Sequence, residues 1–507
     1  MAQDTVAPQP LTGTGLISGR MQLVLILTST TLSGAAYGFT WNVVTVALPD
    51  MMGAFAATPD QISWIMISFI VGSAISTASV GWFSNRFGRR RIYMWAGFTF
   101  AVALIGCALS ETLYAAVFWR LMQGIAGAAL LPVGQTIAVN AMPPEKYSRA
   151  TSIWAIGFVT SSVISPSMGG FIIDWFGWPA VFLVAVPATA AYLLIGAIAI
   201  PEDEPQPSPM DWVGFASLLI GLGLLQVGLA QGERYGWLES PRVVALLLAA
   251  AAAFWVFFVH ILRTANPFIP PALFKDRNFR LGFGFVLVMG GVMYLPMFFV
   301  PLLLDRVAGF PVVVIGMAMA SRGVGSIVGL LFQSRYGDSL DQRWLLVFGC
   351  GIVVVSSYMM SLWSVDVTFK AVFLASAIYG ISGAFTWGPL NRLSLSKVPK
   401  TLQNMAFPLF YLAFEVGGAI GTAIFVTLNT NMAQAMYALL GQHVTEFNEN
   451  FTYLDRNGIW DRTDIADLTV LSNEISRQAE LIAYTNSFLM IAIIFALLAP
   501  LAFLFRR

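Results

Sequence analysis

Charged side chains are scarce in this chain. Only 10% of its 507 residues are Asp, Glu, Lys or Arg, whereas soluble globular proteins carry about 25%. Hydrophobic residues make up 57% of the chain. This balance excludes an ordinary soluble domain, and the net charge of +1 gives no basis for binding nucleic acid.

Cysteine and histidine are almost absent, with two residues of each. Cys107 and Cys350 both lie in apolar runs, so we interpret them as small buried residues and not as a disulfide. His260 and His443 lie far apart without cysteine partners, and the sequence contains no metal-ligand spacing or phosphate-binding loop. We therefore expect no enzyme, no metal and no cofactor.

What the chain has instead is a succession of apolar runs, each about 20 residues long and separated by short polar segments. Helices of this length satisfy their own backbone inside a bilayer, so we predict an all-α polytopic membrane protein with about fourteen transmembrane helices. The first twenty residues are polar and unlike a cleavable signal peptide. The expected spans are 21–48, 61–83, 92–110, 113–139, 150–173, 179–199, 211–231, 242–262, 279–302, 312–334, 344–363, 370–391, 403–429 and 482–505.

The basic residues predict the orientation of these spans. An even number of spans places both termini on one side of the membrane. Most of the 27 Lys and Arg residues then fall in segments on that side, including Arg86 and the run Arg89–Arg91. Because basic loops remain inside the cell, we expect both termini in the cytoplasm.

The apolar run at residues 113–139 contains an arginine well inside the expected span. As a helix it would place an arginine, an amide and several small residues on one face: Arg120, Gln123, Gly124, Gly127, Ala128 and Leu131. An arginine so deep in hydrocarbon is costly and cannot easily face lipid. Arg120 must therefore point into a polar cavity or find a partner, unless its head extends to the membrane surface. We favour a polar pathway through a helical bundle.

Two other segments combine small residues with charges. The turn after the second span contains Gly81, Asn85, Arg86, Gly88 and Arg89, and a weaker echo occurs at 334–343, which suggests two duplicated halves. The fifth span contains a proline that bends a helix and glycines that permit close packing: Gly157, Pro166, Gly169 and Gly170. Topological anchoring and ordinary helix packing explain these features equally well.

Taken together and in this order, these motifs resemble the major facilitator superfamily, specifically its fourteen-spanner drug:proton antiporter branch of EmrB- and QacA-type exporters. The similarity extends to residues 43–49, 211–215, 231–240 and 266–279, and so covers nearly the whole chain. It implies a major facilitator fold with two six-helix bundles, two inserted helices and alternating access around a central cavity.

We accordingly expect four units: a cytoplasmic tail at 1–20, an N-terminal six-helix bundle at 21–200, an inserted two-helix linker at 201–278, and a C-terminal six-helix bundle at 279–507. The last unit includes a periplasmic loop at 430–481. The acidic, proline-rich residues 201–209 predict a stiff connector, and the helical periodicity of 468–484 should extend the final span outwards.

The resemblance also implies a function. It is the export of hydrophobic or amphipathic compounds by proton antiport across the bacterial inner membrane, as in multidrug efflux and antibiotic resistance. Exporters of the EmrB type work with a periplasmic EmrA-type adaptor and an outer-membrane channel. The loop at 430–481 is either a site for such an adaptor or a cap over the protein's own outer vestibule.

Several positions depart from the family pattern. The family usually has acids where this chain has Thr40, Asn85 and Asn486, and a glycine where it has Ser165. A hydroxyl or an amide forms hydrogen bonds but does not take up and release a proton. Two alternatives follow from this: an uncoupled facilitator, and a membrane sensor or scaffold without transport.

Glu415 is the carboxylate that lies near the middle of an expected span, and glycines follow it directly. Burial favours its neutral form and a nearby cation favours its charged form, which is the sensitivity that proton coupling requires. We predict that Glu415 carries the proton and that Arg120 or Arg322 sets its affinity; a structural Glu–Arg pair is the alternative.

Most aromatic residues of membrane helices pack against lipid or against neighbouring helices. A minority could line an adaptable cavity for apolar or cationic aromatic compounds. Our candidates lie on spans with small or polar neighbours, and they are Thr40, Trp41, Asn42, Trp154, Trp387 and Tyr411.

Overall fold

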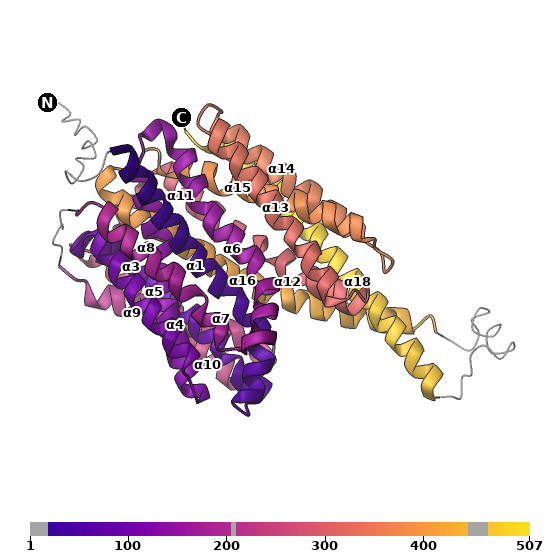
Figure 1. The fold of residues 1–507 in the computed structure, drawn as a ribbon. Helices are drawn as coiled ribbons and strands as arrows, with labels where there is room; N and C mark the ends of the chain where they lie inside the picture. The colour runs from indigo at the N-terminus through magenta and orange to yellow at the C-terminus, as the bar shows by residue number, and fades with distance from the viewer. Residues whose placement is uncertain (1–18, 204–208, 445–464, 507) are drawn as a thin grey trace.

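The computed structural model describes residues 19–203, 209–444 and 465–506, and these residues form helices joined by short segments (Figure 1). Thirteen helices are long and apolar enough to span a membrane, or fourteen when the bent helix α6 (Tyr147–Phe176) is counted as one span. The bend of 52° in α6 lies at Pro166, which cannot donate its backbone nitrogen to the helix. The all-helical fold class predicted from the sequence is confirmed.

The first six spans form one bundle. Besides α6, its elements are α1 (Gly19–Ala54), α2 (Pro59–Ile62), α3 (Trp64–Phe87), α4 (Arg89–Ala108), α5 (Leu113–Asn140), α7 (Ala180–Leu183) and α8 (Ala185–Ala199). Helix α1 packs against α6 and α8, and α3 packs against α5. Glycines bring these pairs together, because a Cβ atom at Gly157 would collide with the carbonyl of Thr31 and one at Gly124 with the carbonyl of Phe69.

The last six spans form the second bundle. Its elements are α11 (Arg277–Met293), α12 (Leu295–Leu302), α13 (Val312–Tyr336), α14 (Gln342–Ser361), α15 (Phe369–Leu395), α16 (Lys400–Gly441) and α18 (Ile465–Leu498). Short 3₁₀ or π segments complete the chain: η1 (Pro144–Lys146), η2 (Trp237–Glu239), η3 (Pro271–Lys275), η4 (Leu303–Val307) and η5 (Ala499–Leu504). Helix α11 packs against α16, and α15 packs against both α13 and α14.

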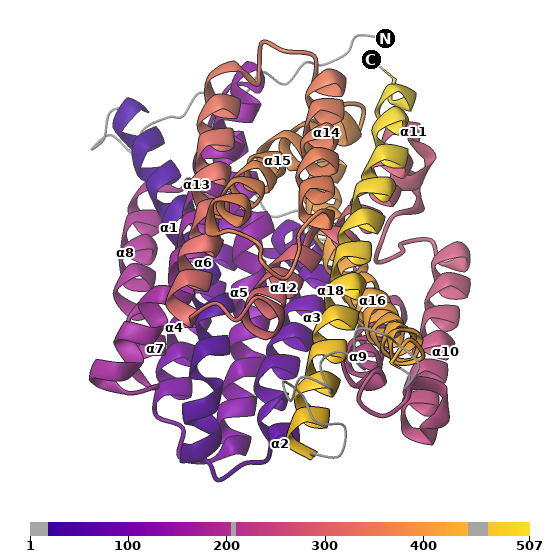
Figure 2. The same ribbon diagram turned by 90° about the vertical axis from the view of Figure 1, so that its right-hand side faces the viewer.

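The two bundles meet along two helix pairs, α6 with α13 and α3 with α16, and we call this junction the seam. The inserted helices α9 (Trp212–Gly232) and α10 (Pro241–Arg263) lie beside the second pair (Figure 2). Helix α9 contacts both α3 and α16, and so covers the seam on this side, whereas α10 packs against α9 and is largely exposed.

Both ends of the described chain lie at one end of the molecule, which we call the termini face (Figure 2). The far face is the opposite end. Helices α16 and α18 have 42 and 34 residues, well beyond the roughly 20 that cross a bilayer, and both extend beyond the bundles (Figure 1).

The structure and the expected outer loop differ at one point. The sequence predicts a loop at 430–481, whereas α16 continues as a helix through Gly441 and α18 begins at Ile465. The polar residues 429–431 resemble a loop, but packing between α16 and α18 keeps this part of the chain helical. Residues 445–464, together with 1–18 of the expected tail and 204–208 of the connector, lie outside the described residues.

Candidate functional site

Glu415 lies in the middle of α16, at the seam. The hydroxyl of Ser73, on α3 of the other bundle, donates a hydrogen bond of 2.8 Å to its Oε1 atom, across 342 positions of sequence. The hydroxyl of Tyr37 lies 3.4 Å from that of Ser73. Within the described part of the chain, the buried Oε2 atom has no hydrogen-bond partner and no ion pair includes Glu415. A single carboxyl group without a cationic partner therefore joins the two bundles.

Close packing of α16 against α11 fixes this position. A Cβ atom at Gly417 would collide with the carbonyl of Leu287, and one at Gly421 would collide with Gly291. The two backbones therefore approach each other two and six residues beyond Glu415, as small residues allow in membrane helices.

Arg120 is fully buried in the first bundle, with an exposed fraction of 0%. Its Nη1 atom donates to Oε1 of Gln123 at 2.6 Å, and its Nε atom donates to the carbonyl of Ile65 at 3.3 Å. The guanidinium carbon lies 4.1 Å from the centre of the Phe69 ring. These contacts hold Arg120 against α3 and away from the surface, without an ion pair to Glu415.

Arg322 is held at the break between α11 and α12 in the second bundle. There the carbonyl of Met293 accepts hydrogen bonds from the Tyr379 hydroxyl at 3.0 Å and from Nη2 of Arg322 at 3.4 Å. The guanidinium carbon lies 4.9 Å from the centre of the Tyr379 ring. The two arginines thus occupy comparable sites in the two bundles, each against an aromatic ring and a backbone carbonyl. Neither is paired with Glu415.

Three of the predicted cavity residues meet at the seam, closer to the termini face. Tyr411 of α16 places its ring 5.0 Å from that of Trp387 on α15 and 6.4 Å from that of Trp154 on α6. Its hydroxyl donates a 2.7 Å hydrogen bond to Oε1 of Gln135 on α5. We call these four residues the Tyr411 cluster. It contains side chains from both bundles and closes the seam at this level.

The other three cavity candidates lie elsewhere. Trp41 packs with its ring 5.3 Å from Phe69, and the amide of Asn42 donates to the carbonyl of Ser162 at 3.2 Å, which joins α1 to α6. The hydroxyl of Thr40 donates to the carbonyl of Ala36 in its own helix at 3.0 Å. The structure therefore divides the six candidates into two groups.

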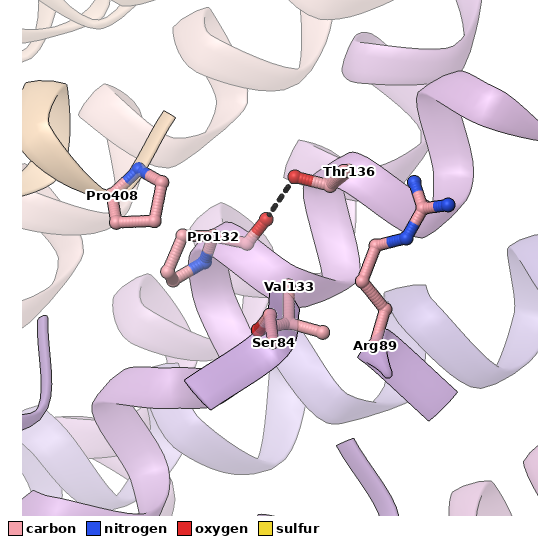
Figure 3. Close-up of a pocket in the computed structure, with 6 residues that line it drawn as sticks. All are labelled: Ser84, Arg89, Pro132, Val133, Thr136 and Pro408. Atoms are coloured by element: carbon pink, nitrogen blue, oxygen red, sulfur yellow. Dashed lines mark hydrogen bonds between the residues drawn. The ribbon is translucent and has the colours of Figure 1, made fainter. Parts of the chain in front are cut away.

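The seam is narrow at the termini face. A cavity of about 10 Å³ remains there, room for about one water molecule (Figure 3). It is lined by Ser84, Arg89, Pro132, Val133, Thr136 and Pro408. Pro408 of α16 lies opposite Pro132 of α5, so the two bundles approach each other closely here (Figure 3).

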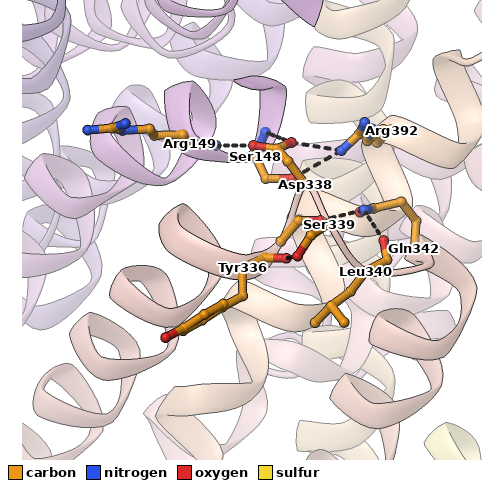
Figure 4. A network of polar contacts seen from close by, with 9 residues as sticks. Ser148, Arg149, Tyr336, Asp338, Ser339, Leu340, Gln342 and Arg392 are labelled. Carbon is orange, nitrogen blue, oxygen red and sulfur yellow. Dashed lines mark hydrogen bonds and ion pairs between the residues drawn. The ribbon is translucent and has the colours of Figure 1, made fainter. Parts of the chain in front are cut away.

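Asp338 also joins the bundles at this face. It lies between α13 and α14 of the second bundle, and its carboxylate accepts hydrogen bonds from the backbone nitrogens of Ser148 at 2.9 Å and Arg149 at 3.3 Å (Figure 4). Those nitrogens belong to the first turn of α6, where unpaired N–H groups and the helix dipole favour an anion. Arg392 of α15 donates to the same carboxylate at 2.8 Å. Three donors therefore compensate the charge of Asp338.

The basic turn between α3 and α4 binds the connector. Gly88 has a φ of +90°, a conformation that favours glycine, and it precedes the first turn of α4. The backbone nitrogen of Arg89 donates to Asp203 at 2.9 Å, and its guanidinium donates to the same carboxylate at 2.7 Å. Asp203, near the start of the connector, is therefore fixed to the termini face of the first bundle.

Several motif glycines lie at tightly packed positions. Gly81 is buried within α3, a Cβ atom at Gly127 would collide with Tyr37, and one at Gly169 would collide with Val43. At Gly170, by contrast, a Cβ atom would meet nothing within 4 Å. The amide of Asn486 lies 3.2 Å from the sulfur of Met432, which ties α18 to α16.

The inserted helices are tied to α16 at the far face. Glu233, just after α9, accepts hydrogen bonds from the Thr427 hydroxyl at 2.6 Å and from the Trp237 ring nitrogen at 3.1 Å. Burial by itself would raise the pKa of Glu233, but the hydrogen bonds from Thr427, Trp237 and Thr430 outweigh it and hold the pKa below its usual value.

Three residues of the site, Ser73, Gln135 and Asp338, were not predicted from the sequence. Ser73 and Gln135 are polar residues within apolar spans, and this feature could have indicated them. Asp338 belongs to the repeated turn at 334–343, where comparison with the first turn would have marked it as a charge at the bundle junction.

Comparisons with known proteins give the same picture. The family model described as "Major Facilitator Superfamily" matches residues 30–422. The chain is 29% identical to multidrug export protein EmrB of Escherichia coli (strain K12), covering 95% of this chain and 94% of EmrB. It is 26% identical to fatty acid resistance protein FarB of Neisseria gonorrhoeae, covering 91% and 92%.

Solved structures share the fold. The proton:xylose symporter XylE aligns with a TM-score of 0.63 and the human organic anion transporter MFSD10 (TETRAN) with a TM-score of 0.60. Each is 13% identical and covers 96% of this chain and 100% of its own. At this identity the likeness concerns the fold alone. Since the family model covers most of the chain, the protein belongs to the major facilitator superfamily, a family of membrane transporters and not of enzymes.

Proposed function

We propose that this protein exports lipophilic compounds from a bacterial cytoplasm in exchange for protons, by alternating access. One observation carries the proposal. Glu415 is a buried carboxyl group at the seam: it accepts a hydrogen bond from Ser73 of the opposite bundle, and its Oε2 atom has no hydrogen-bond partner among the described residues. An ionised carboxylate is costly in such a place, so its charge depends on which face of the membrane it can reach.

Proton exchange at Glu415 would then follow the opening of the seam. The Tyr411 cluster and the narrow cavity separate Glu415 from the termini face in this conformation. Movement of α3 away from α16 would break the Ser73 hydrogen bond and expose the carboxyl group. A compound that binds beside the ionised carboxylate would compete with the proton, which is the requirement for antiport.

The substrate range follows from the lining and from the names of the relatives. Aromatic rings surround the seam, and such surfaces bind apolar and cationic aromatic compounds without narrow selectivity. EmrB is named a multidrug export protein and FarB a fatty acid resistance protein. Hydrophobic or amphipathic compounds are therefore the substrate class.

Orientation and partners complete the proposal. The excess of basic residues at the termini face supports a cytoplasmic location for that face, with the protein in the bacterial inner membrane. The extensions of α16 and α18 then project into the periplasm. Between them lies a cavity of about 290 Å³, lined mainly by apolar residues such as Leu440, Leu471 and Ile475. An EmrA-type adaptor linked to an outer-membrane channel would bind at this projection.

An uncoupled facilitator is the second candidate. The hydroxyl of Thr40 is bonded within its own helix and the amide of Asn486 contacts a methionine, so neither position supplies a titratable group. A sensor or scaffold without transport explains less, because it has no use for the buried charges of Arg120 and Glu415.

The test is efflux of a panel of dyes, bile salts and antibiotics from cells that express the wild type or Arg120→Ala, with and without a proton uncoupler. We expect wild-type efflux that stops when the uncoupler is added, and weak efflux by the variant. Efflux that ignores the uncoupler would favour the facilitator. Absence of efflux for every compound would contradict transport of this class altogether.

A further inference from the structure

Two hydrogen-bond donors in the Tyr411 cluster have no acceptor. The Nε2 atom of Gln135 and the Nε1 atom of Trp154 are buried, and neither has a hydrogen-bond partner in the part of the chain that the structure describes. The two residues have exposed fractions of 0% and 3%. Buried polar groups are usually paired, because an unpaired buried donor has lost its hydrogen bond to water without a replacement. Two such donors in one cluster therefore require an explanation.

The two donors belong to adjacent helices of the first bundle, α5 and α6, and both residues contact Tyr411. A Cβ atom at Gly134, the residue before Gln135, would lie 3.3 Å from the Nε1 atom of Trp154. The ring of Tyr411 packs against Trp154, and its hydroxyl binds the oxygen of the Gln135 amide, which leaves the amide nitrogen unused. Both donors thus border the surface that Tyr411 covers from the second bundle.

Opening the seam at the termini face would remove this cover. Gln135 and Trp154 remain with α5 and α6, while Tyr411 and Trp387 leave with α16 and α15. The first bundle would then expose both donors, the amide nitrogen of Gln135 and the ring nitrogen of Trp154, together with the face of the indole ring. An acceptor oxygen on a flat aromatic compound matches this arrangement, because the oxygen satisfies the donors while the rings stack.

We infer that Gln135 and Trp154 form a recognition site for a hydrogen-bond acceptor, such as a carbonyl oxygen, on aromatic lipophilic substrates. This inference rests on the proposed export function and specifies its substrate class. In the conformation described here, Tyr411 occupies the site, so binding of substrate and closure of the termini face exclude each other.

The same arrangement links the site to the proton. Tyr411 and Glu415 are four residues apart on α16 and therefore lie on one face of the helix. A substrate that displaces Tyr411 also moves Glu415 relative to Ser73. Binding of the acceptor thereby disturbs the hydrogen bond from Ser73 of the opposite bundle to this carboxyl group.

A matched pair of probes tests the inference. Tetraphenylphosphonium carries no acceptor, and its (4-acetylphenyl)triphenylphosphonium analogue differs from it by an acetyl group and has the same charge. We would measure equilibrium binding of each cation to the full-length purified protein by dialysis and mass spectrometry. Wild-type protein should bind the acetyl compound about five- to tenfold more tightly, as one or two added hydrogen bonds allow.

Two variants remove one donor each. Gln135→Leu and Trp154→Phe should both reduce this preference to about twofold or less, while the affinity for tetraphenylphosphonium changes little. The control is Gln333→Leu, which removes an equally buried amide that lies beside Gly337 and Gly388 within the second bundle. It should keep the wild-type preference. The ratio of the two affinities is the readout, because a general loss of folding would lower both together.

The outcomes separate the two proposals. Equal binding of both cations by the wild type, binding of neither, or an unchanged preference in both donor variants would overturn the recognition site. Uncoupler-sensitive efflux of both cations would still support proton-driven export in that case. Conversely, a preference that disappears in Gln135→Leu, without any effect of the uncoupler on efflux, would retain the site and contradict antiport.

Discussion

Two carboxylates join the bundles of this transporter, and their surroundings are opposite. Asp338, at the termini face, accepts two backbone hydrogen bonds from α6 and one from Arg392, and its side chain is 20% exposed. Glu415, in the middle of the seam, accepts one hydrogen bond from Ser73, and its second oxygen is buried without a partner among the described residues. One charge is fully compensated and the other is not.

The difference separates two tasks that a carboxylate can perform at a moving interface. A charge paired with several hydrogen-bond donors stabilises one conformation, so Asp338 acts as a fastening between the bundles. A carboxyl group with weak compensation changes its charge readily when its surroundings change, so Glu415 suits proton transfer. Variants of each carboxylate test this difference in role.

The largest effect is expected for Glu415→Gln. The amide retains the size and the hydrogen-bonding ability of the side chain but carries no exchangeable charge. Efflux driven by a pH gradient in proteoliposomes should fall to the level of protein-free vesicles, while exchange of labelled for unlabelled substrate should continue. Glu474→Gln, at an exposed pair with Arg477, is the control and should behave as wild type. Full gradient-driven efflux by Glu415→Gln would refute the assignment.

Asp338→Asn should have the next largest effect, on conformation and not on coupling. Loss of the charge weakens the bonds to α6 and Arg392, so the termini face should open about tenfold more often. The measurement is maleimide labelling of Ser84→Cys, which lines the narrow cavity, with Cys107 and Cys350 replaced by Ser.

Arg392→Ala tests whether this effect belongs to the pair. Added to Asp338→Asn, it should increase labelling much less than it does alone, because the two residues share one interaction. Independent, additive effects would show that Asp338 does not fasten the bundles through Arg392.

Ser73→Ala should have a moderate effect. It removes the hydrogen bond from the opposite bundle to Glu415 and should change the initial rate of gradient-driven efflux about three- to tenfold. Ser79→Ala is a matched control on the same helix, since the Ser79 hydroxyl bonds back to the carbonyl of Ile75. Equal rates for the two variants would show that the Ser73–Glu415 contact plays no part in transport.

The smallest effect concerns Glu233, a third carboxylate, which binds the inserted helices to α16. Its pKa is lower in the folded protein than in the unfolded chain, so its contribution to stability is present above the usual glutamate pKa of about 4.3 and is lost as the pH falls through the lower folded value. Glu233→Gln should therefore lower the melting temperature slightly at pH 7. The difference from wild type should shrink below about pH 4; a constant difference would argue against this electrostatic origin.

The transmembrane helices can be predicted from the sequence because each span is a local run of about 20 apolar residues. The partners of the buried charges cannot be predicted in this way. Ser73 and Glu415 are 342 positions apart, and nothing in either span identifies the other. The groups that bind Arg120 are a glutamine one turn away and a backbone carbonyl of α3. That Arg120 or Arg322 sets the proton affinity of Glu415 remains a prediction.

The length of α16 has a mechanical consequence. Its 42 residues correspond to a rod of about 63 Å, and it carries Pro408, Tyr411, Glu415 and Thr427 in succession. The glycine contacts at Gly417 and Gly421 form a fulcrum near its middle. If this stiff helix tilts about that point, its two ends move in opposite directions. The passage between the bundles then does not open at both faces at once, so no continuous channel crosses the membrane.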